Sequence, residues 1–156
     1  MHTAYINIGS NLGDRHGNIA AAVAAVKERI NPEVRLSEPV ESPPWGYRSA
    51  NSFINIGAAF ETQLTPLELI ETLLDIQNSI SDLPHRNAHG GYTDRIIDID
   101  LIAVDQLVIS TPELTLPHPR MHLRHFVLIP LQELAPQWVH PVLGLTPAEM
   151  LAEAPD

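Results

Sequence analysis

The sequence predicts an α+β fold in which helices pack on a mainly antiparallel sheet. Stretches in which apolar and polar residues alternate are typical of strands, and stretches with apolar residues three or four positions apart are typical of helices. Their order along the chain is strand, helix, strand, strand, helix, strand, strand. Because a loop rather than a helix joins the second and third strands, a ferredoxin-like sheet with helices packed on it, in α/β/α layers, is the natural arrangement.

The first half of the chain begins with an alternating stretch at residues 4–9, which predicts a strand. Asp14 is a suitable N-cap for a helix over residues 14–29, whose apolar residues form one stripe. The turn between strand and helix lacks the Gly-Lys-Ser/Thr ending of a phosphate-binding P-loop, so we expect a plain connection there. A second strand is predicted over residues 34–40 and a third over residues 53–60.

The second long helix has the clearest start signal in the sequence. Thr65 and Glu68 form a capping box, and Pro66 occupies the first helical position, so a helix is expected over residues 66–81. The segment 82–93 that follows is long for a connector, and such loops are often functional, although a tip with incidental charges is the alternative.

The last third of the chain combines strands with short helices. A strand from Ile97 is followed by residues 107–109, which we expect to be its hairpin partner. A helix is predicted over residues 126–135, with Pro130 near its first turn, and a second capping box at Thr146 starts a short terminal helix.

Composition limits the class of protein. A chain of 156 residues with 44% hydrophobic and 18% charged residues is ordinary for one globular domain, so a single domain over residues 1–156 is expected. No apolar run is long enough to span a membrane, and the start lacks the pattern of a secretory signal, so we expect no membrane partner and a cytoplasmic location. The absence of cysteine excludes disulfides and thiolate metal sites.

The formal net charge of -10 argues against a nucleic-acid partner, because such proteins present a basic stripe to the phosphates. A small anionic substrate is still compatible with this charge if a metal and a local basic cluster receive it. The basic and imidazole side chains do gather late in the chain, at His85, Arg86, His89, Arg95, His118, Arg120, His122, Arg124 and His125.

The stretch at residues 94–102 is the most informative one. Asp98 and Asp100 fall on one face of the predicted strand, with Cα atoms about 6.7 Å apart, and at an effective dielectric near 20 such charges repel by roughly 2.5 kcal/mol. A divalent cation removes this repulsion, and Mg²⁺ commonly takes one or two carboxylates and completes its shell with water and phosphate. Arg95 could hold a phosphate oxygen. The alternative is a solvated outer face of the sheet.

Two further patterns suggest ligand contacts. Phe53 and Asn55 share a strand face. In this arrangement the ring can stack on a flat heterocycle while the amide forms hydrogen bonds with the polar edge of that heterocycle. The alternative is that Phe53 is a core residue and Asn55 closes a local backbone bond. His118 lies between two prolines on a stiff backbone, which favours a ligand-facing role.

Four segments, in this order and spacing, resemble the 6-hydroxymethyl-7,8-dihydropterin pyrophosphokinases of folate biosynthesis. The segments are Ala-Tyr-Ile-Asn-Ile-Gly-Ser-Asn-Leu-Gly (4–13), Ser-Pro-Pro-Trp-Gly (42–46) with Phe-Ile-Asn (53–55), Arg-Ile-Ile-Asp-Ile-Asp (95–100), and Leu-Pro-His-Pro-Arg-Met-His-Leu-Arg-His-Phe-Val-Leu-Ile-Pro-Leu (116–131). Each is weak alone, but together they are specific and cover nearly the whole chain. The resemblance implies an ATP-dependent pyrophosphokinase (diphosphotransferase) that transfers pyrophosphate from Mg-ATP to the pterin hydroxymethyl group and releases AMP. We expect it to act as a monomer on these two small molecules.

The resemblance also implies roles for individual residues. Asp98 and Asp100 correspond to ligands of two Mg²⁺ ions, and with Arg95 they form the catalytic group. The residues that correspond to pterin contacts are Ser42, Pro44, Trp45, Phe53, Asn55 and Phe126. Those that correspond to ATP contacts are Gln77, Arg86, Tyr92, Arg95, Leu101, Thr115, His118 and Arg124.

The chain departs from the family pattern on the ATP side. Tyr92 begins Tyr-Thr-Asp where many members have Trp-Gly-Pro, Glu113 stands where some members use an Arg, and Gln77 stands where a Glu is common. These differences motivate a second hypothesis, a non-catalytic pterin-binding relative with a weakened ATP site. An unrelated metal-dependent phosphotransferase and a structural domain with a solvated acidic strand are also compatible with the acidic pattern.

Overall fold

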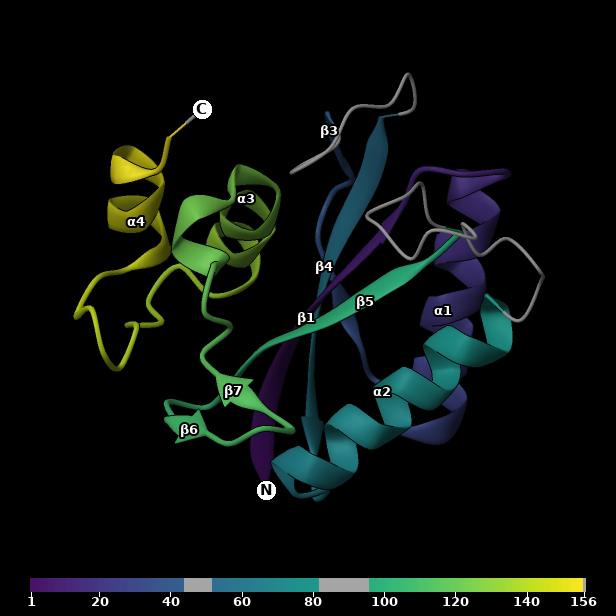
Figure 1. Cartoon of the computed structure of the whole chain (residues 1–156), viewed down its shortest axis with the longest axis horizontal. Helices are drawn as coiled ribbons and strands as arrows, with labels where there is room; N and C mark the ends of the chain where they lie inside the picture. The colour runs from purple at the N-terminus through teal and green to yellow at the C-terminus, as the bar shows by residue number, and fades with distance from the viewer. Residues whose placement is uncertain (44–51, 82–95, 156) are drawn as a thin grey trace.

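The structure is a computed structural model that describes residues 1–43, 52–81 and 96–155 (Figure 1). Within these ranges five strands form one sheet in the order β2-β4-β1-β5, with β3 also paired to β4, and each pairing is antiparallel. The strands are β1 (His2–Ser10), β2 (Arg35–Leu36), β3 (Val40–Ser42), β4 (Phe53–Thr62) and β5 (Asp98–Val104). The predicted α+β class with an antiparallel sheet is confirmed.

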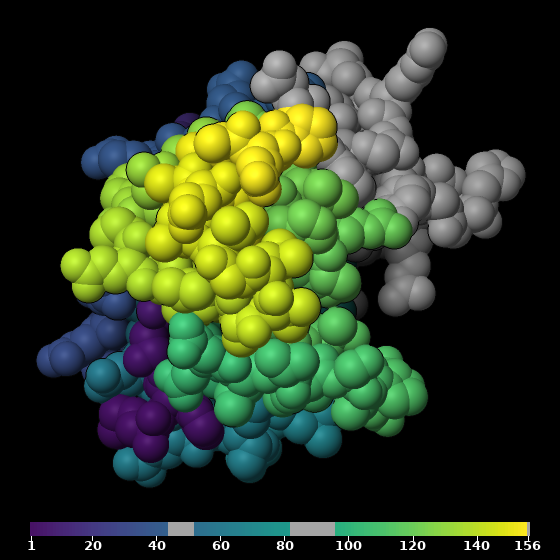
Figure 2. All heavy atoms as spheres, turned by 90° about the vertical axis from the view of Figure 1, so that its left-hand side faces the viewer, coloured from purple at the N-terminus to yellow at the C-terminus, as the bar shows by residue number. Residues whose placement is uncertain are grey.

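Helices cover both faces of this sheet (Figure 1). They are α1 (Arg15–Arg29), α2 (Pro66–Ile80), α3 (His125–Leu134) and α4 (Pro147–Glu153), with a 3-10 turn η1 (Met121–Leu123) before α3. Helices α1 and α2 lie on one face, and α3 with α4 lies on the other. Figure 2 shows this second face covered by the carboxyl-terminal segments in green and yellow. The described helices include none long and apolar enough to cross a membrane.

The side chains of the sheet alternate between two apolar cores. Ile8 and Ile99 point into the core beneath α1 and α2, where they join buried residues such as Leu73. The other face packs against α3 and α4 through Ile102 and Leu128. Because neighbouring strand residues face opposite sides, the residues next to Ile8 and Ile99 face α3.

The helix starts follow the predicted capping. The Asp14 carboxylate accepts a hydrogen bond of 3.1 Å from the Gly17 N–H at the start of α1. At the start of α2, Thr65 and Glu68 exchange the two hydrogen bonds of a capping box, and Thr146 starts α4 in the same way.

The predicted strand over residues 34–40 is wrong as a continuous element, because it is split into β2 and β3. Between them the Ser37 N–H donates to the Gly57 carbonyl at 2.9 Å, and the Ser37 hydroxyl accepts from the Gly57 N–H at 2.8 Å. The Ser37 hydroxyl therefore accepts the hydrogen bond that a backbone carbonyl would accept in a continuous strand pair. Pro39, which has no N–H, cannot continue the ladder at this point.

The predicted hairpin between β5 and residues 107–109 is also wrong. Ile109 pairs instead with Leu116, in a separate ribbon of β6 (Ile109–Ser110) and β7 (Thr115–Leu116). Asp105, at the end of β5, has a left-handed backbone with φ of 49°, and its carboxylate accepts from the Thr3 N–H at 2.8 Å. This turn is anchored to β1, so the chain leaves β5 rather than folding back along it.

Helix α3 begins one residue earlier than expected, at His125. Pro130 is therefore in its second turn and not near the first.

Candidate active site

Two rows of paired residues cross the centre of the sheet on the face that α3 covers. Gly9 on β1 lies opposite Asn55 on β4 and opposite Asp98 on β5. Two residues earlier, Asn7 lies between Gly57 and Asp100 in the same way, and this row is the neighbour of the first. Directly opposed residues share a face, so the sheet brings the Phe53–Asn55 face and the acidic pair onto one surface.

A hydrogen bond to a neighbouring strand orders the Asn55 side chain on this surface. The Asn55 side chain is buried, and its amide Nδ2 donates to the Ser42 hydroxyl at 2.8 Å. A Cβ atom added at Gly9 would lie 2.6 Å from the Asn55 Oδ1 and 3.3 Å from a ring carbon of Phe53. Three predicted pterin residues, Ser42, Phe53 and Asn55, therefore meet around a glycine that leaves room for them.

Phe126 approaches this surface from the first turn of α3. Its carbonyl accepts a hydrogen bond of 2.9 Å from the Asn7 amide. The Arg124 guanidinium carbon lies 5.6 Å from the centre of the Phe126 ring, a cation–π distance. The start of α3 thus brings an aromatic ring and a cation to the same part of the sheet.

Asp98 and Asp100 are partly exposed, while Ile99 between them is buried. Among residues 1–43, 52–81 and 96–155, no three His, Asp or Glu side chains gather closely enough to hold a metal ion. Two carboxylates on one face nevertheless fit Mg²⁺, because this ion usually takes one or two protein carboxylates with water and substrate phosphate as its other ligands.

His118 lies beside the acidic pair on a half-buried site. Burial is the main cause that lowers the pKa of His118 to about 4; the positive charges of Arg124 and Arg120 act in the same direction, and Asp98 opposes them. The ring Nδ1 accepts a hydrogen bond of 3.2 Å from the Arg120 N–H, so the neutral ring carries its proton on Nε2. His118 is therefore a neutral N–H donor near Asp98.

An open groove runs along the edge of β5 that faces away from β1, between α2 and the β6–β7 ribbon. Its volume is about 670 Å³ with the solvent at its mouth included. The groove is lined by Ile70, Leu74, Gln77, Asp98, Ile99, Asp100, Leu101, Glu113, Leu114, Thr115, His118 and Pro119. One end is polar, and the side chains toward the start of α2 are apolar.

Backbone groups of β5 also face this groove. The Ile99 N–H donates to the Gln77 Oε1 at 2.8 Å and therefore points away from β1. In an antiparallel ladder this orientation repeats at every second residue, so the N–H and carbonyl of Leu101 point toward the groove as well. The Leu101 side chain is buried in the core, which leaves its backbone as the group that a ligand could meet.

The predicted site residues thus fall into two groups that meet at Asp98. Ser42, Phe53, Asn55 and Phe126 lie on the sheet face, whereas the groove holds Gln77, Leu101, Thr115 and His118. The predicted residues Pro44, Trp45, Arg86, Tyr92 and Arg95 lie outside the described residues. Sequence reasoning missed Asn7 and Gly9, although period two along the first strand puts both on one face of it.

This arrangement defines the class as a small α+β domain with an acidic sheet face and an adjoining groove. The sequence profile of the 7,8-dihydro-6-hydroxymethylpterin-pyrophosphokinase (HPPK) family matches residues 5–136. The chain belongs to this family.

Individual relatives agree with that placement. A 2-amino-4-hydroxy-6-hydroxymethyldihydropteridine pyrophosphokinase of Porphyromonas gingivalis is 37% identical over 142 residues, which are 90% of this chain and 95% of the relative. The enzyme of the same name from Methylorubrum extorquens is 36% identical over 156 residues, or 98% and 94% of the two chains. The crystal structure of wild-type Plasmodium falciparum HPPK-DHPS with pteroate superposes with a TM-score of 0.73 over 97% of this chain and 42% of that one. Its identity of 14% shows a shared fold only.

Proposed function

We propose that this protein transfers pyrophosphate from ATP to the hydroxymethyl group of 6-hydroxymethyl-7,8-dihydropterin, a step of folate biosynthesis. Membership of the HPPK family makes the chain an ATP-dependent pyrophosphokinase. The observation that carries the assignment of its site is the row Asn55–Gly9–Asp98. It puts an amide suited to a heterocycle and a carboxylate suited to a metal on one face, two strand spacings or about 10 Å apart.

The pterin is proposed to lie over Gly9. Asn55 would read the polar edge of the ring, because its amide is already oriented by Ser42. Phe53 and Phe126 would enclose the two faces of the ring, in the offset contacts that aromatic systems prefer. Pro44 and Trp45 are proposed to complete this pocket. The hydroxymethyl arm would then extend toward Asp98.

ATP is proposed to occupy the groove along β5. The apolar side chains and the outward-facing backbone of Leu101 suit a nucleobase, with Thr115 beside them. The triphosphate would lie at the polar end, where His118 offers its Nε2–H and Gln77 and Arg124 offer donors. Arg86, Tyr92 and Arg95 are proposed as further ATP contacts.

Asp98 and Asp100 would hold Mg²⁺, with two ions as our proposal. When bound, Mg²⁺ neutralises phosphate charge and lowers the barrier to attack at phosphorus. The side chains around it would orient the two substrates. The pterin hydroxyl oxygen attacks the β-phosphorus, the bond from that phosphorus to the α,β-bridging oxygen breaks, and AMP leaves with the bond's electron pair. The hydroxyl proton is released, and positioning provides most of the rate.

The finer description of the fold is also a proposal. The strand order β2-β4-β1-β5 and the two antiparallel neighbours of β1 support a ferredoxin-like sheet. We further propose one domain over residues 1–156, acting as a monomer in the cytoplasm, where ATP is available. No observation on the described residues favours a non-catalytic pterin-binding relative.

The assay that tests the function is incubation of the protein with MgCl₂, ATP and the hydroxymethyl dihydropterin, followed by chromatography of the nucleotides. AMP formed in equal amount to a pterin diphosphate supports the proposal. Formation of ADP, or pterin binding without turnover at saturating Mg-ATP, would contradict it. Omission of Mg²⁺ with added chelator serves as the matched blank.

A further inference from the structure

Asn7 is a buried amide in a strand of mostly apolar residues. It is 3% exposed and lies on the face of β1 that α3 covers, in the row with Gly57 and Asp100. A side-chain amide buried this deeply requires a hydrogen-bond partner. Its Nδ2 donates to the Phe126 carbonyl at 2.9 Å.

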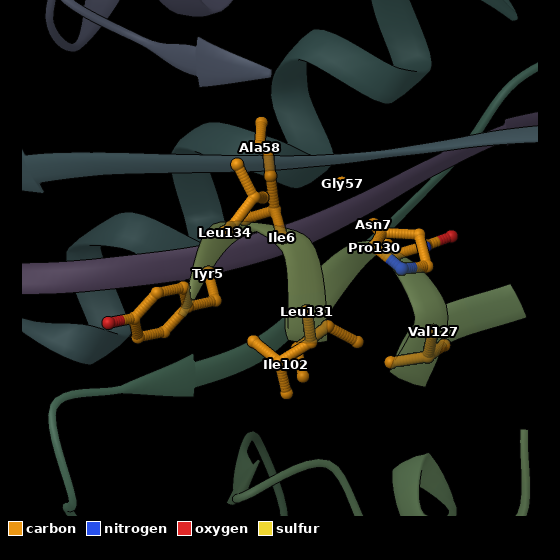
Figure 3. Close-up of a pocket in the computed structure, with 10 residues that line it drawn as sticks. All are labelled: Tyr5, Ile6, Asn7, Gly57, Ala58, Ile102, Val127, Pro130, Leu131 and Leu134. Carbon is orange, nitrogen blue, oxygen red and sulfur yellow. The ribbon is translucent and has the colours of Figure 1, made fainter. Parts of the chain in front are cut away.

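That carbonyl lacks the donor that a regular α-helix would supply. In an α-helix the N–H of residue i donates to the carbonyl of residue i−4, so the Phe126 carbonyl should receive the N–H of residue 130. Residue 130 is a proline within α3 and has no N–H. Figure 3 shows Asn7 and Pro130 together on the wall of the small cavity between α3 and the sheet, which both residues line.

The same proline holds the helix close to the strands. The Pro130 Cβ lies 2.6 Å from the position that a Cβ on Gly57 would take, so only glycine permits this approach. Gly57 is directly opposite Asn7. The contact therefore brings α3 within reach of the Asn7 amide.

We propose that Asn7 is a positioning residue for Phe126. Its amide replaces the helical hydrogen bond that Pro130 cannot make and fixes the first turn of α3 over the sheet. The proposal rests on the proposed role of Phe126 as one wall of the pterin pocket. It predicts that the need for Asn7 disappears when residue 130 regains an N–H.

The test is a double-mutant cycle of wild type, Asn7→Ala, Pro130→Ala and the double variant. Alanine at 130 supplies the N–H and keeps the Cβ that contacts Gly57. Pterin affinity is measured by fluorescence titration without nucleotide, and thermal unfolding is measured on the same samples. Asn7→Ala should weaken pterin binding about five- to tenfold when residue 130 is proline, and about twofold or less when it is alanine. The drop in melting temperature, about 3 °C in the proline background, should shrink in parallel.

Asn31→Ala is the matched control, because the Asn31 Nδ2 also donates to a backbone carbonyl, that of Glu61, at 2.9 Å and away from the site. It should lower the melting temperature and leave pterin affinity unchanged. Equal weakening of pterin binding by Asn7→Ala in both backgrounds, or no weakening, would overturn the proposal. If the wild-type protein binds no pterin and also forms no AMP from Mg-ATP and the pterin, the proposed function fails. In that case the melting temperatures alone test the hydrogen bond. A smaller decrease in melting temperature on Asn7→Ala when residue 130 is alanine supports the replaced hydrogen bond, and an equal decrease in both backgrounds refutes it.

Discussion

Asn55 and Asp98 lie on one row across three strands, and Gly9 is directly opposite both. The amide end and the acidic end of the site are therefore spaced by the pairing of β1 with its two neighbours and not by a loop. Gly9 contributes no side chain, and the Asn55 Oδ1 and the Phe53 ring lie close over it.

Gly9→Ala should selectively weaken pterin binding. The new methyl group would lie 2.6 Å from the Asn55 Oδ1 and 3.3 Å from the Phe53 ring, so the amide must move from its bond with Ser42. Overpacking of this kind costs about 1–3 kcal/mol, and we expect a loss of pterin affinity in that range. Calorimetric titration with the pterin, and separately with Mg-ATP, measures it. An equal loss for both ligands would contradict the selective effect.

Asp98→Asn and Asp100→Asn should each abolish turnover while the fold persists. Each variant keeps the backbone pairing with β1 and loses one metal-binding charge, so kcat should fall at least about a hundredfold. The melting temperature of the metal-free protein should stay the same or rise, because the repulsion between the carboxylates is removed. Asp75→Asn is the control, since Asp75 pairs with Arg29 on an exposed surface. Turnover near the wild-type rate in either Asp98→Asn or Asp100→Asn would contradict the assignment of that residue as a metal ligand.

Local signals in the sequence were sufficient for most elements of the fold. The capping boxes at Thr65 and Thr146 act within one turn of chain, and both helices begin where predicted. The alternating acidic strand is equally local, and it forms β5. The split of the second strand was not predictable in this way, because it depends on a hydrogen bond between Ser37 and the distant Gly57.

The same distinction applies to the site. Phe53 and Asn55 share a face because side chains of a strand alternate between the two faces of a sheet, and the sequence alone shows this. The distance from Asn55 to Asp98 depends instead on the register of three strands. Asn7 is a polar residue in an apolar pattern, and its partner, the Phe126 carbonyl, lies on a helix 119 positions later in the chain. No pattern within β1 could identify that partner.

Gln77→Leu should loosen the edge of β5. The Gln77 Oε1 is the acceptor for the Ile99 N–H at 2.8 Å, between the two acidic residues. Without it, hydrogen exchange of the Ile99 amide should accelerate by about tenfold, the equivalent of roughly 1.4 kcal/mol, and the KM for Mg-ATP should rise. Exchange measured by NMR tests this, with Asn78→Leu on the exposed side of α2 as the control. An unchanged rate of hydrogen exchange at the Ile99 amide in Gln77→Leu would contradict the proposed role of this hydrogen bond in holding the edge of β5.

His118 should make the protein less stable as the pH falls. Burial holds its pKa at about 4 in the folded protein, below the ordinary 6.5. Between pH 6.5 and 4 the unfolded chain therefore binds a proton that the folded protein does not, and the free energy of unfolding decreases. The decrease due to this residue should be about 1–3 kcal/mol, allowing for partial solvent screening. Urea unfolding of wild type and His118→Gln at several pH values measures it. Parallel pH profiles for the two proteins would contradict the assignment.

The most direct test of the pyrophosphokinase activity follows the phosphorus atoms of ATP. The protein is incubated with MgCl₂, the hydroxymethyl dihydropterin and ATP labelled in separate samples at the α, β or γ position, and the pterin product is isolated. The β and γ labels should each appear on the pterin in a one-to-one ratio with it, and the α label should remain in AMP. Transfer of the γ label alone, with ADP as the other product, would contradict pyrophosphate transfer by this site.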